Sequence, residues 1–236
     1  MLVPERRVEL AAASALGLVL AVVFAAAAIR LETGVPGLRV VHRIAASLEV
    51  IVVLWLGWIT WRSRAAEPGR HGAALLAIAL TAVLSIVGIA TGRNPPPAAV
   101  AVNLLGGLML AAVFAWMLGR SGKGNRALTP IAGFLVGFML AIQLVLGTRL
   151  SIVERHAAAL PAHALLAMAL VALLGWVGLA RVGGGAGRVV FVLALAAPIA
   201  GFTALHYEWS AGAALAHSAA AALLLVSSAY VLGRSA

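Results

Sequence analysis

Eight apolar runs, separated by short breaks rich in Arg, Gly and Pro, organise this 236-residue sequence. A helix that crosses a membrane needs about 20 mostly apolar residues. The seventh run contains Pro198 and Gly201, which predict a kink that neighbouring helices tolerate inside a membrane. We therefore predict an all-α polytopic membrane protein with eight transmembrane helices. The runs cover residues 8–29, 40–60, 73–91, 98–118, 127–148, 157–180, 189–205 and 211–232.

The composition agrees with a membrane protein and excludes an ordinary soluble domain. Hydrophobic residues make up 64% of the chain and charged residues only 10%, whereas soluble domains are about 25% charged. The sequence has no Cys, which excludes disulfides, thiolate-bound iron–sulfur clusters and thiol catalysis.

The net charge of +10 could indicate nucleic-acid binding, but the positions of the basic residues explain it differently. They lie near the ends of the apolar runs, where an excess of Lys and Arg marks the cytoplasmic side of a membrane protein. We expect an inner (plasma) membrane protein with both termini in the cytoplasm, the lipid bilayer as its surroundings and no nucleic-acid partner. The eleven on the predicted inner side are Arg6, Arg7, Arg62, Arg64, Arg70, Arg120, Lys123, Arg126, Arg181, Arg188 and Arg234; the six on the outer side are Arg30, Arg39, Arg43, Arg93, Arg149 and Arg155.

The sequence also repeats itself. The first and fifth runs end in similar segments, residues 29–31 (Ile-Arg-Leu) and 148–150 (Thr-Arg-Leu). The run that follows each of them carries a His near its start, His42 and His163, and a Trp thirteen residues later. Self-similarity at a long period is the signature of a duplicated architecture.

The fourth and eighth runs extend this match, with residues 103–107 (Asn-Leu-Leu-Gly-Gly) aligned to residues 217–221 (His-Ser-Ala-Ala-Ala). We predict two four-helix-bundle halves, residues 1–122 and 123–236. Because four helices return the chain to the side on which it started, the halves are expected to be parallel repeats about an axis along the membrane normal.

Four polar side chains, His42, Asn103, His163 and His217, fall at one depth in this arrangement. Each lies two to seven residues inside the outer end of its helix, roughly 3 to 10 Å below the interface. Because neutral imidazole is a ligand of haem iron, His163 and His217 predict a haem bound from both faces. The alternative is that each His hydrogen-bonds a group on a neighbouring helix. In the first half Asn103 stands where a second ligand is expected, so a site there would be five-coordinate, weak or vacant.

Four arginines lie close to this histidine layer: Arg39, Arg43, Arg149 and Arg155. They could bind haem propionates through paired hydrogen bonds or extend to lipid headgroups. Arg43 is the strongest propionate candidate because it adjoins His42.

Two acidic residues are weaker candidates for chemistry. Glu49, seven residues after His42 and on nearly the same helical face, could relay protons or be a protonated carboxyl that is hydrogen-bonded to a neighbouring helix. Glu32, in the first outer loop, could face a substrate or be an ordinary surface residue. Among the other histidines, His71 is expected to be solvated, and His156 and His206 to cap helices at the outer interface.

Several of these motifs together resemble the heme A synthase family. The resemblance rests on His42-Arg43, residues 88–91 (Gly-Ile-Ala-Thr), residues 143–148 (Gln-Leu-Val-Leu-Gly-Thr), His163 and His217, and it covers essentially the whole chain. It implies eight helices in two four-helix halves. The second half would bind a b-type haem (heme b) through His163 and His217.

The same resemblance implies that the first half holds a substrate haem, with His42 as one iron ligand. Family members oxidise a methyl group of heme O to the formyl group of heme A for terminal oxidases, so respiratory-chain or haem-biosynthesis proteins are expected partners. This sequence departs from the family at Asn103, at the short loop around Glu32, and at Ala164 where an Arg usually follows the helix 6 His.

Three functions remain open at this point. The first is a heme A synthase-like protein that acts in cytochrome oxidase assembly and, if active, is an oxidoreductase. The second is a non-catalytic haem protein for electron transfer or haem handling that uses only the second half. The third is a small transporter or haem-free accessory subunit, which the scarcity of charges within the helices disfavours.

Overall fold

The computed structural model describes residues 4–31, 35–92, 94–120, 128–152, 159–182 and 184–235. Within these residues the regular structure is entirely helical. Eight of the helices found there are long and apolar enough to cross a membrane. The predicted class, an all-α polytopic membrane protein, is therefore confirmed.

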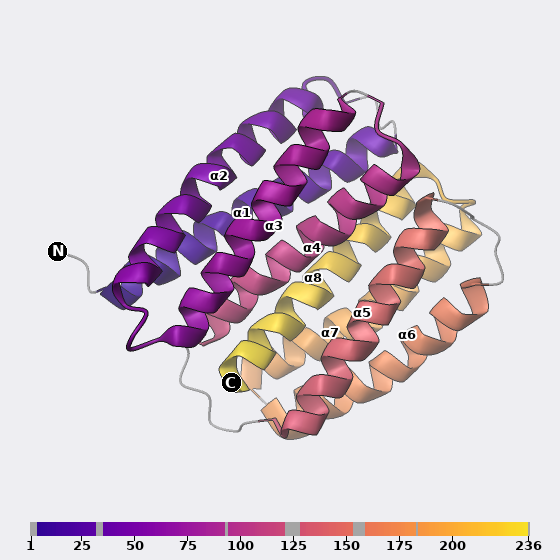
Figure 1. The fold of residues 1–236 in the computed structure, drawn as a ribbon. Coiled ribbons are helices and arrows are strands. Elements are labelled where there is room, and N and C mark those ends of the chain that lie inside the picture. The colour runs from indigo at the N-terminus through magenta and orange to yellow at the C-terminus, as the bar shows by residue number, and fades with distance from the viewer. Residues whose placement is uncertain are drawn as a thin grey trace. The chain divides into compact units, whose positions relative to one another are not determined.

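The helices follow the predicted apolar runs and extend a few residues beyond most of them (Figure 1). Pro68, Pro97 and Pro130 each begin a helix, where a missing backbone N–H is not needed. The elements are α1 (Pro4–Arg30), α2 (Leu38–Arg62), α3 (Pro68–Thr91), α4 (Pro97–Gly119), α5 (Pro130–Ile152), α6 (Ala159–Trp176), the π-helical segment η1 (Val177–Val182), α7 (Gly184–His206) and α8 (Ala211–Ser235).

The chain divides into two compact units, Met1–Gly122 and Lys123–Ala236. This is the boundary at which the sequence repeat was placed. The roles that the sequence assigns to the halves, a substrate-haem site and a cofactor site, remain predictions.

In the first unit α1 packs along both α2 and α4, while α3 packs against α2 and α4 (Figure 1). Small residues allow the close approach. Ala11 and Ala15 of α1 have no exposed surface, and a Cβ placed on Gly107 of α4 would lie 2.9 Å from Cγ2 of Val23. Helices in lipid associate through such small-residue contacts, so this unit is a closed bundle of four helices.

In the second unit α6 packs against α5 and α7, and α7 packs against α8. Helices α5 and α8 meet at few residues, whereas the corresponding helices of the first unit, α1 and α4, are in extensive contact. One contact is at Gly133, where an added Cβ would lie 3.6 Å from Leu232. The second bundle is therefore open along its α5–α8 side.

One segment of the second unit departs from regular α-helix. The sixth apolar run ends in the π-helical η1, where Gly178 lies so close to Gly187 that a Cβ on Gly178 would be 2.5 Å from the Gly187 carbonyl oxygen. Only glycine permits this backbone approach. Pro198, for which a kink was predicted, lies inside the continuous helix α7.

Arginines lie over tryptophan rings at the ends of three helical segments, opposite to the ends that carry His42, Asn103 and His163. Arg62 covers Trp58 and Arg64 covers Trp61 at the end of α2, with 4.9 and 4.1 Å from guanidinium carbon to ring centroid. Similar pairs end α4 and η1, Arg120 with Trp116 and Arg181 with Trp176. Such cation–π pairs combine a charge with an amphipathic ring, and this pattern is typical of residues at a membrane interface.

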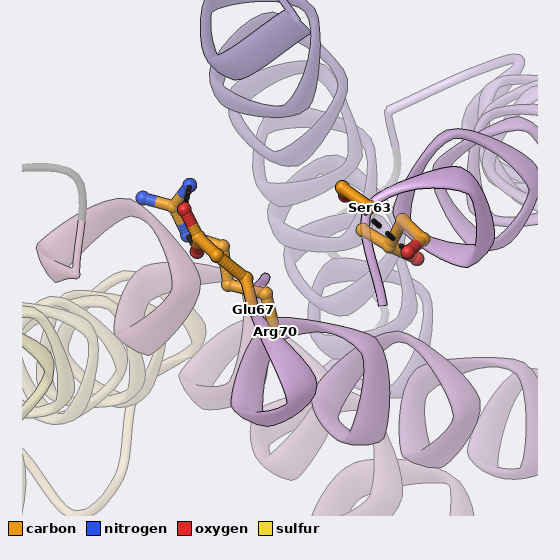
Figure 2. Close-up of polar contacts among 4 residues, drawn as sticks. Ser63, Glu67 and Arg70 are labelled. Atoms are coloured by element: carbon orange, nitrogen blue, oxygen red, sulfur yellow. Dashed lines mark hydrogen bonds and ion pairs between the residues drawn. The ribbon is translucent and has the colours of Figure 1, made fainter. Parts of the chain in front are cut away.

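A local ion pair lies at the start of α3. Arg70 Nε lies 2.9 Å from a carboxylate oxygen of Glu67 (Figure 2), and the Arg70 side chain is buried. The neighbouring His71 differs from the expectation of a solvated side chain. It is half-buried, its ring meets the Trp61 ring edge-on at 5.4 Å, and its Nδ1 is buried without a hydrogen bond. The exposed indole of Trp61 covers it.

Candidate functional site

His163 of α6 and His217 of α8 lie close together in the second unit. Their ring centroids are 6.4 Å apart and the ring planes are nearly perpendicular, at 81°. Both side chains are half-buried. The sequence predicted that these two residues face one another, and the structure brings them together across the open bundle.

Each of these rings packs against a glycine of the preceding helix. A Cβ placed on Gly147 of α5 would lie 3.1 Å from Cε1 of His163, and a Cβ on Gly201 of α7 would lie 3.1 Å from Cε1 of His217. These distances are tighter than ordinary van der Waals contact. The two glycines therefore make the space in which the imidazole rings lie.

The hydrogen bonds of His217 fix its tautomer. Its Nδ1 lies 3.0 Å from the carbonyl oxygen of Ala197. Because a carbonyl only accepts, Nδ1 must carry the proton and Nε2 must carry a lone pair. Histidine ligands of metals are commonly oriented by a backbone carbonyl in this way.

Gln143 of α5 holds His163. Its amide nitrogen donates to the carbonyl oxygen of His163 at 3.1 Å, and the same nitrogen lies 3.3 Å from His163 Nε2. The amide nitrogen therefore faces the ring, so Nε2 accepts and Nδ1 carries the proton. His163 Nδ1 and the Gln143 side-chain oxygen are buried without hydrogen-bond partners, an arrangement that costs roughly 1–3 kcal/mol for each such group.

Trp209 completes one wall of this site. It lies in the turn between α7 and α8, where Glu208 and Trp209 have positive φ values of 49° and 59°. Its ring centroid is 6.3 Å from that of His217, and its Nε1 is buried without a partner. The backbone N–H of Trp209 donates to the Ala204 carbonyl at 2.7 Å, which holds this strained turn in place.

In the first unit His42 of α2 has an arrangement like that of His217. Its Nδ1 lies 3.2 Å from the carbonyl oxygen of Val22 on α1, so Nδ1 donates and Nε2 keeps its lone pair. Asn103 of α4 is half-buried. No hydrogen bond links His42 and Asn103, both of which the structure describes. The first unit therefore presents one oriented imidazole rather than a facing pair.

The remaining predicted site residues lie in different places. Arg39 and Arg43 are exposed and line a shared hollow with Val40 and Asn94. Arg149 is exposed at the end of α5.

Of the two carboxylate candidates, Glu49 is buried in α2, with 5% of its surface exposed. It belongs to the stripe of buried residues that faces the interior of the first unit. Glu32, together with Arg155 and His156, lies outside the described residues. His206 is exposed at the end of α7, beside Tyr207.

The sequence analysis did not assign site roles to Gln143, Gly147, Gly201 or Trp209. One signal could have found the contacts across the helix pairs. His42, His163 and His217 each contact a residue twenty positions earlier on the preceding antiparallel helix. Counting twenty residues back from each of these three histidines predicts Val22, Gln143 and Ala197 as their partners.

The donor set of the second unit suits a haem. Two imidazoles are few ligands for a bare metal ion, but a porphyrin supplies four nitrogens of its own and needs only axial ligands from the protein. Two imidazoles that bind one metal atom from opposite sides, each about 2 Å away through a nitrogen, have centroids roughly 6 Å apart. The observed 6.4 Å fits that arrangement.

Comparison of the sequence with protein-family models and with curated proteins finds no match. The chemistry of the site therefore has to follow from its own residues.

Proposed function

We propose that this protein is an integral-membrane haem protein whose second unit binds one b-type haem through His163 and His217. The observation that carries the proposal is the 6.4 Å between the two ring centroids. It is supported by the Ala197 carbonyl, which leaves the lone pair of His217 on Nε2, and by the glycines that give both rings their space. A bound b-type haem supplies reversible one-electron chemistry.

The residues of the chain have separable roles in this proposal. The Ala197 carbonyl holds His217 in the tautomer whose Nε2 is free to bind iron. Gln143 donates a hydrogen bond to the backbone carbonyl of His163, and its amide nitrogen faces His163 Nε2. That Nε2 therefore carries the lone pair that would bind iron in place of the amide contact. Gly147 and Gly201 keep the rings from being displaced, and Trp209 shields His217 on one side.

The test is the absorption spectrum of the full chain, purified after expression with sufficient haem. We expect a Soret band and the split visible bands of a reduced low-spin b-type haem. His163→Ala and His217→Ala should each abolish them, because each removes one of the two side chains that would hold the haem. His206→Ala is the matched control, since His206 is exposed at the end of α7 and its loss should leave the spectrum unchanged. A colourless wild-type protein would refute the proposal.

A second, more specific proposal is heme A synthase-like activity, the oxidation of a haem methyl group during cytochrome oxidase assembly. The observation that favours it is His42, whose ring is oriented by the Val22 carbonyl as His217 is by Ala197. The resemblance of the sequence to the heme A synthase family supports the same assignment. In this proposal the first unit holds the substrate haem (heme O, with heme A as product), and respiratory-chain or haem-biosynthesis proteins are the partners.

Expression in cells that make heme O but lack a heme A synthase tests this activity. The second proposal predicts heme A among the extracted pigments, and His42→Ala should remove it while the b-type spectrum of the second unit persists. Pigments without heme A, from membranes in which the protein and its b-type spectrum are present, would exclude the enzyme and leave the haem-binding proposal standing.

The proposed setting is the plasma membrane, with both termini in the cytoplasm. The eleven basic residues at the helix ends of one side, against six on the other, support this orientation. Because the chain has no Cys, a single Cys introduced at Ser235 or at Pro36 can be labelled without background. We expect an impermeant maleimide added to intact cells to label the Pro36→Cys variant only.

A further inference from the structure

We propose that the hollow beside the start of α2 binds the phosphate of an anionic phospholipid of the surrounding bilayer. The hollow has a volume of about 450 Å³ and is lined by Arg39, Val40, Arg43 and Asn94. We call it the arginine hollow. It is independent of the histidine pair, which lies in the other unit.

The charges in the arginine hollow suit a phosphate. Arg39 and Arg43 are one helical turn apart and so lie on the same face of α2. Both are exposed, and neither forms an ion pair with a carboxylate in the part of the chain that the structure describes. Guanidinium groups bind phosphate oxygens in pairs of parallel hydrogen bonds, and the Asn94 amide adds a further donor.

The backbone adds a smaller attraction for an anion. Helix α2 begins after Gly37, which has a positive φ of 78°, and its first turn has no side-chain cap. The amide groups at a helix N-terminus carry partial positive charge and favour a negatively charged group nearby. Arg39 and Arg43 lie in the first two turns of α2, so their charges add to this attraction.

The surface next to the arginine hollow is apolar, which favours a lipid over a free phosphate ion. Val40 and Ile44 of α2 are 59% and 55% exposed, and Ile86 and Ile89 near the end of α3 are 66% and 83% exposed. Val40 lines the hollow itself, and Ile44, Ile86 and Ile89 lie near the same ends of the neighbouring helices α2 and α3. Acyl chains can cover this surface, whereas inorganic phosphate gains nothing from it.

The arginine hollow also faces away from the interior of its unit. The His42 ring reaches Val22 on α1, whereas the described residues that line the hollow are Arg39, Val40 and Arg43 of α2 and Asn94, which follows α3. Binding at the hollow therefore does not depend on the haem proposed for the second unit. The Soret band attributed to His163 and His217 should be unchanged when the arginines are replaced.

Native mass spectrometry of the full chain in detergent, titrated with phosphatidylglycerol, tests the proposal. We expect a bound phosphatidylglycerol whose affinity falls about tenfold in the Arg39→Gln/Arg43→Gln double variant. The matched control is Arg62→Gln/Arg64→Gln at the opposite end of the same helix, where each arginine lies over its own tryptophan. That control removes the same charge and should keep the high-affinity lipid.

The proposal would be overturned by unchanged affinity in the Arg39/Arg43 double variant, by an equal loss in the control, or by equally tight binding of zwitterionic phosphatidylcholine. Displacement of the lipid by millimolar inorganic phosphate would also overturn it, in favour of a site for free anions. Should the double variant fail to fold, as judged by helical circular dichroism and melting, Asn94→Ala provides the test, with an expected two- to threefold loss of affinity.

Discussion

The two units place their four helices in the same order but close them differently. In the first unit α1 and α4 pack tightly, through the buried alanines of α1 and the contact of Gly107 with Val23. In the second, α5 and α8 meet at few residues, and the imidazoles of His163 and His217 face one another. The two units share a helical frame, while the side chains within it differ. In the second unit three polar atoms of the site, His163 Nδ1, the Gln143 side-chain oxygen and Trp209 Nε1, are buried without hydrogen-bond partners.

The alignment of the halves identifies the residues responsible. Gly106 and Gly107 correspond to Ala220 and Ala221 in the second unit. Helix α8 therefore lacks the glycine pair at which side chains of α1 and α3 closely approach α4. Glu49, seven residues after His42, corresponds to Leu170, seven residues after His163, and both are buried. These pairs make the comparison testable.

The largest expected effect comes from exchanging the second of these pairs. Leu170→Glu should destabilise the second unit by about 3 kcal/mol, because it places an ionisable group in an apolar helix interface. Glu49→Leu should change stability by less than about 1 kcal/mol, because an apolar side chain of similar volume needs no partner. Thermal melting of the purified variants measures both. A loss above about 2 kcal/mol in Glu49→Leu would show that Glu49 makes a necessary polar contact.

Filling a glycine beside the histidine pair should have the next largest effect, on haem rather than on stability. Gly201→Val would displace the His217 ring, since even a Cβ at this position lies 3.1 Å from it. We expect the haem affinity to fall about a hundredfold, or about 2.7 kcal/mol, as measured by haem titration. Gly137→Val is the control, because nothing lies within 4 Å of a Cβ at Gly137. Equal haem loss in both variants would contradict the role of Gly201.

A smaller effect is expected from crowding the closed side of the first unit. Gly107→Leu should destabilise the protein by roughly 1–3 kcal/mol, because the new side chain has to displace Val23. The corresponding change in the second unit, Ala221→Leu, should cost less, because α5 and α8 are not tightly packed. Melting temperatures compare the two variants directly. A larger loss in Ala221→Leu would overturn the view that only the first unit is closed.

Much of the frame could be predicted from the sequence, because long apolar runs and short polar breaks leave a membrane protein few alternatives. The facing of His163 and His217 also followed from their matched depth on alternate helices. The difference in closure did not, since it depends on where single methyl groups meet across helices, as at Gly107 and Val23. Nor did the half-buried position of His71, since it depends on the neighbouring Trp61 side chain.

The smallest expected effect concerns Gln143 and Val22, which precede their histidines by the same twenty residues. Val22 contributes a backbone carbonyl, which substitution preserves, whereas Gln143 contributes a side-chain donor. Gln143→Leu should therefore cost about 1 kcal/mol of stability and weaken haem binding about fivefold, without abolishing the Soret band. Val22→Leu is the matched control and should change neither quantity measurably. Haem titration and melting of both variants provide the comparison, and complete loss of haem in Gln143→Leu would mean that Gln143 is itself part of the ligand set.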